Sequence, residues 1–115
     1  MIRDLILRNR SYRRFIEKEK ISRETLVELV DLARLSPSAR NAQSLKYYLS
    51  FTPETNDVIF PHLSWAGYLT DWNGPEKGER PSAYIIIMND TTLSSNYFSD
   101  DGIASQSILL GAVEK

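Results

Sequence analysis

The apolar run Ala83-Tyr84-Ile85-Ile86-Ile87-Met88 is the feature that most limits the folds open to this chain. An unbroken apolar run without polar alternation is typical of a strand that is buried on both faces. Such a strand needs packed layers above and below it. A second segment, residues 46–51, is aromatic and rich in β-forming residues. We therefore predict that both segments belong to one sheet.

Apolar residues at helical spacing predict helices before and after these strands in the sequence. The first is expected over residues 2–9 and the second from an N-cap at Ser22 to about residue 35. Thr52-Pro53-Glu54 should open a third, and Ser36-Pro37 should cap a short helical turn that ends at residue 42. The last helix follows a cap at Ser99 or Asp100. Its core-facing stripe is predicted to be Ile103, Leu110 and Val113.

Composition excludes several classes of protein. The chain has 115 residues, 42% hydrophobic and 25% charged, which is average for one globular domain. A net charge of −1 gives no field that would attract nucleic acid or an anionic membrane. The absence of cysteine removes disulfides, thiolate metal sites and a cysteine nucleophile, and a single histidine makes no metal cluster. No segment predicts a membrane span or a signal peptide, so we expect a cytoplasmic protein.

Two polar strings flank the second predicted helix. Arg10-Ser11-Tyr12-Arg13-Arg14-Phe15 offers guanidinium groups, which bind phosphate as planar forks. By itself, this string favours an exposed arginine-rich turn, because such turns are common. In Ser36-Pro37-Ser38-Ala39-Arg40-Asn41-Ala42-Gln43, hydroxyl and amide groups suit a heterocycle edge or a polyol. By itself, that string is also consistent with an ordinary capped loop.

Taken in this order, with an amphipathic helix between them, the two strings resemble the flavin-binding start of the nitroreductase family. The matching elements are Arg10-Ser11-Tyr12-Arg13 and the string from Pro37 to Gln43. Asp101-Gly102-Ile103-Ala104-Ser105-Gln106 is similar to the start of the family's long central helix. The resemblance implies an α+β fold with helices around a mainly antiparallel sheet. Residues 1–115 would be the N-terminal part of a single domain, truncated at the C-terminus.

The resemblance also implies roles for individual residues. Arg10 and Ser11 would contact the phosphate of FMN, and Arg13 would lie near the pyrimidine edge of the flavin. In a homodimer, the turn of one subunit would reach the flavin of the other, through Pro37, Ser38 and Asn41, with Gln43 as support. The small residues Gly102, Ala104 and Ser105 would lie at the dimer interface. Two positions depart from the family: Asn9 replaces a frequent arginine, and Ser44 replaces the usual proline.

The activity that the resemblance implies is electron transfer from NAD(P)H to a nitroaromatic, quinone or similar acceptor by a ping-pong mechanism. No catalytic side chain and no metal ligand is predicted. The alternative is a truncated flavin-fold remnant without catalysis that serves as an interaction or flavin-binding module. The aromatic residues between residues 61 and 81, namely Trp65, Tyr68 and Trp72, are expected either to cover the flavin as a lid or to pack on the core or partner subunit.

Overall fold

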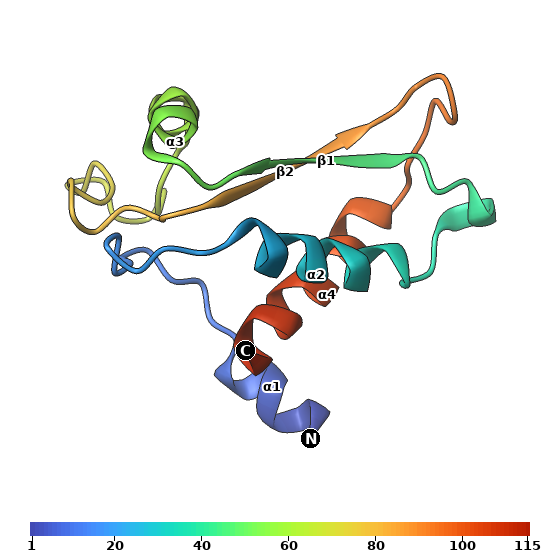
Figure 1. The fold of residues 1–115 in the computed structure, drawn as a ribbon, viewed down its shortest axis with the longest axis horizontal. Helices are drawn as coiled ribbons and strands as arrows, with labels where there is room; N and C mark the ends of the chain where they lie inside the picture. Colours follow the sequence, from blue (N-terminus) through green and yellow to red (C-terminus); the bar gives the residue numbers. More distant parts are fainter.

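The computed structural model describes residues 1–115 and shows a two-stranded antiparallel sheet with helices packed against it (Figure 1). In chain order, the elements are α1 (Ile2–Arg8), α2 (Arg23–Arg34), the 3-10 turn η1 (Ala39–Asn41), β1 (Leu45–Ser50), α3 (Pro53–Ile59), the 3-10 turn η2 (Phe60–His62), β2 (Tyr84–Asn89) and α4 (Asp100–Glu114). The predicted α+β class is confirmed. None of the helices is long and apolar enough to cross a membrane.

Helix starts follow the capping residues in two of the predicted cases. The Ser22 hydroxyl accepts a hydrogen bond from the Thr25 N–H at 3.1 Å at the start of α2. Thr52 caps α3, and Pro53 occupies the first turn. The prediction for Ser36 was wrong, because η1 starts after Ser38. Ser36 instead donates to the Leu32 carbonyl at 2.8 Å and pairs with the Ser107 hydroxyl at 2.6 Å, so it links α2 to α4.

The core lies between α2, α4 and one face of the sheet (Figure 1). Leu29 and Ala33 of α2 meet Ala104 and Ile108 of α4, and all of them are buried. The antiparallel register pairs β1 and β2 so that one face turns toward these helices. The sheet residues that pack on the helices are Leu45, Tyr47, Ile85 and Ile87.

The opposite face of the sheet carries apolar side chains that remain open to solvent. Tyr48, Ile86 and Met88 are 46%, 38% and 43% exposed. The expectation that β2 is buried on both faces was therefore wrong for these 115 residues. The reason is that β2 pairs only with β1, and the packed helices cover a single face.

α4 presents a different stripe to the core from the one predicted. Its buried positions include Ala104, Ile108 and Gly111, whereas Ile103 is 37% exposed. The apolar residues of α4 are spread around the whole helix, so their spacing did not identify the buried side. Small residues bring α4 close to α2: a Cβ on Gly111 would collide with the Leu32 side chain. Ala104 thus packs against the core of this chain, and Gly102 faces open space. The expected dimer interface along this helix stays a prediction.

Trp65 anchors the irregular segment between α3 and β2. Its ring lies 6.4 Å from Phe15 and 6.0 Å from Phe60, centroid to centroid. Gly74 sits against the indole with a φ of +105°, a conformation that side chains rarely allow. Packing on the core, one of the two alternatives for these aromatic residues, therefore applies to Trp65 and not to Tyr68. Trp65 packs inward, Tyr68 is fully exposed and Trp72 is half-buried.

We predict that Gly74→Ala destabilises the protein by about 2–4 kcal/mol, because the new Cβ would meet the rigid indole while the backbone is held at positive φ. The controls are Gly78→Ala, which has a φ of +96° but open space, and Gly67→Ala, which has open space and no positive φ. Gly78→Ala should lower the free energy of unfolding by about 1–2 kcal/mol, and Gly67→Ala should leave it nearly unchanged. Urea unfolding measures all three, and equal losses at positions 74 and 78 would contradict the steric argument.

Candidate functional site

The two polar strings lie at opposite ends of α2 (Figure 1). Arg10, Ser11 and Arg13 precede the helix, and the segment from Pro37 to Gln43 follows it. With 12 residues, α2 is about 18 Å long. Ser11 and Arg13 line one groove, whereas Pro37, Ser38 and Gln43 line a separate cavity. A single chain therefore does not bring the predicted site residues together.

The groove lined by Ser11 and Arg13 has a volume of about 800 Å³ and is open to solvent. Such a volume suits a cofactor-sized ligand. It is formed by the connector between α1 and α2 (residues 9–22) and by the segment after Trp65. Its lining residues are Ser11, Tyr12, Arg13, Arg14, Tyr68, Leu69, Thr70, Asp71 and Trp72. Cationic and aromatic side chains thus face one another across it.

Arg10 and Arg13 keep most of their hydrogen-bonding capacity. Arg10 donates to the Asn9 carbonyl at 3.1 Å and Arg13 to the Ser11 carbonyl at 3.2 Å. Neither guanidinium forms an ion pair. Arg14 differs, because it pairs with Glu79 at 3.3 Å and lies 5.9 Å from the Trp72 ring centre. The free forks of Arg10 and Arg13 can therefore bind an anion such as a phosphate.

The turn after α2 is held by Asp100, the first residue of α4. The Ser38 hydroxyl donates to its Oδ2 at 2.6 Å, and the Ala39 N–H donates to its Oδ1 at 2.9 Å. Ser38 also accepts from the Gln43 N–H at 3.0 Å, which closes the turn on itself. The Ser38 hydroxyl is thus used within the chain, where it fixes the shape of the turn.

The backbone of this turn adopts a conformation that ordinary side chains seldom take. Arg40, Asn41 and Gln43 have φ values of +55°, +53° and +51°. Left-handed residues other than glycine cost about 1–2 kcal/mol each, so the surrounding contacts must enforce them. Gln43 donates to the Asn41 side-chain oxygen at 2.9 Å, and both residues are exposed. The turn therefore projects a preformed amide pair outward, available to another molecule.

Hydrogen bonding lowers the pKa of Asp100, chiefly through the Ser38 hydroxyl and then the Ala39 N–H. Asp100 is 5% exposed, and its lowered pKa keeps the carboxyl group charged at neutral pH. Burial raises the pKa of Tyr47, and the negative charge of Asp100 adds to this rise. The sequence marked Asp100 only as a helix cap. Its partner Ser38 lies 62 positions away, and no local pattern connects them.

Comparison with known proteins identifies the family. A model of the nitroreductase family matches residues 6–68, which include both polar strings and more than half of the chain. The chain belongs to this family, as its motifs predicted. A comparison with curated proteins gave no match.

Solved structures share the fold. One is a candidate NADH dehydrogenase/NAD(P)H nitroreductase from Parabacteroides distasonis, with 24% identity and a TM-score of 0.72 over 96% of this chain. Another is a candidate NADH oxidase from Clostridium acetobutylicum, with 24% identity and a TM-score of 0.71 over 95% of this chain. A nitroreductase family protein from Clostridium novyi has 19% identity and a TM-score of 0.70 over 99% of this chain. The chain spans 61%, 61% and 64% of their lengths, respectively.

We predict that Asp100→Asn makes stability less dependent on acid pH. The pKa of Asp100 is lower in the folded chain than in the unfolded one, so its stabilising effect is complete above about pH 4 and is lost as the pH falls further. The stability gap between wild type and variant should be widest at pH 7 and shrink below pH 4 in urea unfolding. Asp101→Asn, an exposed neighbour, is the control. A gap that stays constant with pH would contradict the assignment.

Proposed function

We propose that this chain forms part of an FMN-dependent oxidoreductase that passes electrons from NAD(P)H to a nitroaromatic, quinone or similar acceptor by a ping-pong mechanism. Membership of the nitroreductase family and the shared fold support the proposal. The observation that carries it is the placement of two half-sites, residues 10–13 and residues 37–43, at opposite ends of α2. One offers free guanidinium groups, and the other offers a rigid turn with outward amides.

The groove residues Ser11 and Arg13, with the adjacent Arg10, fit the phosphate-bearing part of FMN. Arg10 and Arg13 have guanidinium donors outside any ion pair, and the Ser11 hydroxyl is exposed between them in the sequence. These are the groups that recognise phosphate in proteins. The half-buried Trp72 adds an aromatic wall to the same groove.

A second copy of the chain would complete the site. The groove and the turn are separate in one chain, and α2, about 18 Å long, lies between the two polar strings, so the turn of one subunit would reach the groove of another. We propose a twofold homodimer in which Pro37, Asn41 and Gln43 face the partner's flavin. Ser38 would contribute by fixing the turn, because its hydroxyl is already bound to Asp100.

Bound FMN would supply the ability to accept a hydride and pass electrons on. The chain's own residues would bind, orient and tune it. Arg10 and Ser11 would hold the phosphate, and the positive charge of Arg13 would favour negative charge at the pyrimidine edge of the ring. No side chain need form a covalent bond, and none is assigned that role.

We predict that Arg13→Ala weakens FMN binding about tenfold and slows reduction by NAD(P)H, because it removes a charged donor. FMN titration and anaerobic bleaching of the flavin spectrum measure the two effects. Arg3→Ala, an exposed arginine on α1, is the matched control. Unchanged binding and reduction would remove Arg13 from this role. Flavin binding without reduction would favour a flavin-binding module, and a wild type that takes up no FMN would favour a remnant without catalysis.

We predict that impaired variants complement each other when they damage opposite half-sites and are assayed at an FMN concentration too low to fill the damaged sites. Arg13→Ala and Asn41→Ala should each impair reduction by NAD(P)H. A mixture unfolded and refolded together should recover about a quarter of the wild-type rate, because half of the random pairs are heterodimers with one intact site. Separately refolded samples are the control. No recovery would contradict a site shared between two chains.

A further inference from the structure

We infer that Glu17 is a positioning residue, whose carboxylate clamps residues 74–80 to residues 10–17 and so determines where Arg13 stands in the groove. The inference rests on the proposed function, because its consequence is measured as FMN affinity. Glu17 belongs to neither polar string.

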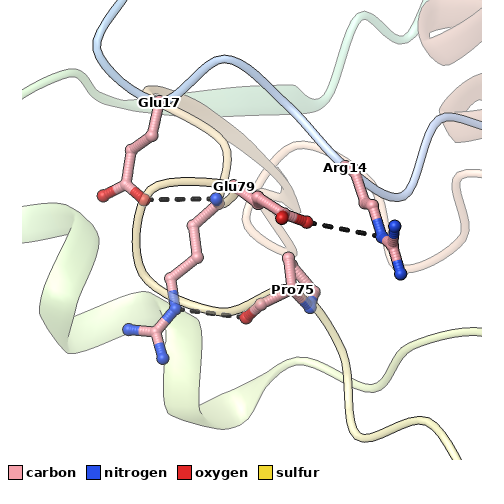
Figure 2. A network of polar contacts seen from close by, with 5 residues as sticks. Arg14, Glu17, Pro75 and Glu79 are labelled. Carbon is pink, nitrogen blue, oxygen red and sulfur yellow. Dashed lines mark hydrogen bonds and ion pairs between the residues drawn. The ribbon is translucent and has the colours of Figure 1, made fainter.

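Glu17 joins two segments that have no helix or strand of their own (Figure 2). Its Oε1 accepts the N–H groups of Gly78 at 2.7 Å and of Arg80 at 3.2 Å. Two backbone bonds run beside this contact: the Phe15 N–H donates to the Glu79 carbonyl at 2.8 Å, and the Glu17 N–H donates to the Gly78 carbonyl at 3.3 Å. Residues 15–17 thus lie along residues 78–80 as a short ladder closed by one carboxylate.

The loop side of the clamp is anchored independently of Glu17. The Arg80 guanidinium lies 3.9 Å above the Phe60 ring. Its Nε donates to the Pro75 carbonyl at 3.3 Å, the contact drawn at Pro75 in Figure 2. Gly74 packs on Trp65, and both Gly74 and Pro75 are buried. The connector therefore takes its position from an already fixed loop.

The Glu17 carboxylate contributes more to holding the connector against the loop than the nearby Arg14–Glu79 ion pair does. Arg14 and Glu79 have side chains that are 69% and 52% exposed, and exposed pairs contribute little. Glu17 is half-buried, and its loss would leave the Gly78 and Arg80 N–H groups without their acceptor. Figure 2 shows the contact of Glu17 and the Arg14–Glu79 ion pair beside each other. They involve different side chains, so substitutions at Glu17 and at Glu79 can test them separately.

The position of one groove wall relative to the other depends on the clamp. Arg13 is two residues before Phe15, whose N–H is a rung of the ladder. Trp72 is two residues before Gly74, at the anchored end of the loop. Loss of the Glu17 carboxylate would leave residues 15–17 held to the loop by the two backbone bonds and by Phe15 on Trp65. This weaker attachment would let the position of Arg13 relative to Trp72 vary.

We predict that Glu17→Ala raises the Kd for FMN about tenfold and removes hydrogen-exchange protection from the amides of Gly78 and Arg80. Glu17→Gln keeps an oxygen acceptor of the same length, so protection and affinity should stay within about threefold of wild type. Glu79→Ala removes only the exposed ion pair, and its FMN affinity should change less than about threefold. If Glu17→Ala does not fold, Glu17→Asp replaces it, because the shorter side chain withdraws the oxygen.

Exchange is measured without FMN, so it tests the clamp separately from the proposed function. Full protection of Gly78 and Arg80 in Glu17→Ala would overturn the clamp. Lost protection with wild-type FMN affinity would overturn the positioning role. A Glu17→Gln variant as impaired as Glu17→Ala would also overturn it, because the oxygen acceptor would then be irrelevant. A wild type that binds no FMN would end the proposed function and this inference together, whether or not the amides are protected.

Discussion

The packing of α2 against α4 is the contact on which the rest of the structure depends. Gly111 removes the side chain that would separate the two helices, and Ala33 and Ala104 keep the contact close. Ser36 and Ser107 add a polar link at one end of the pair. With α2 held in this way, the two polar strings stay at opposite ends of the helix. This separation within one chain is what the proposed homodimer would overcome.

The two irregular halves of the site are ordered by the same physical device. Asp100 gathers a hydroxyl and an N–H from the turn, and Glu17 gathers two N–H groups from the loop. A carboxylate can accept several hydrogen bonds, and charge makes each of them stronger. The flanking chain gains a defined shape without forming a helix or strand. Acidic residues thus build a site whose proposed ligand is itself an anion.

Local signals were sufficient to predict much of the fold. Ser22 and Thr52-Pro53 marked helix starts, and the two β-forming segments marked the strands, because capping and strand propensity act over a few residues. The order of the two polar strings was enough to predict the family. The burial of β2, the core face of α4 and the contacts of Ser36 could not be read in this way. Each depends on a partner from another element, as does the pairing of Ser38 with Asp100 across 62 positions.

The open side of the sheet has a consequence for how the molecule behaves in solution. Within these 115 residues each strand has a single partner, and Tyr48, Ile86 and Met88 are exposed on the uncovered face. A sheet edge without a neighbouring strand can pair with another strand, and an exposed apolar face favours such contacts. The association state of these 115 residues in solution should therefore depend on protein concentration.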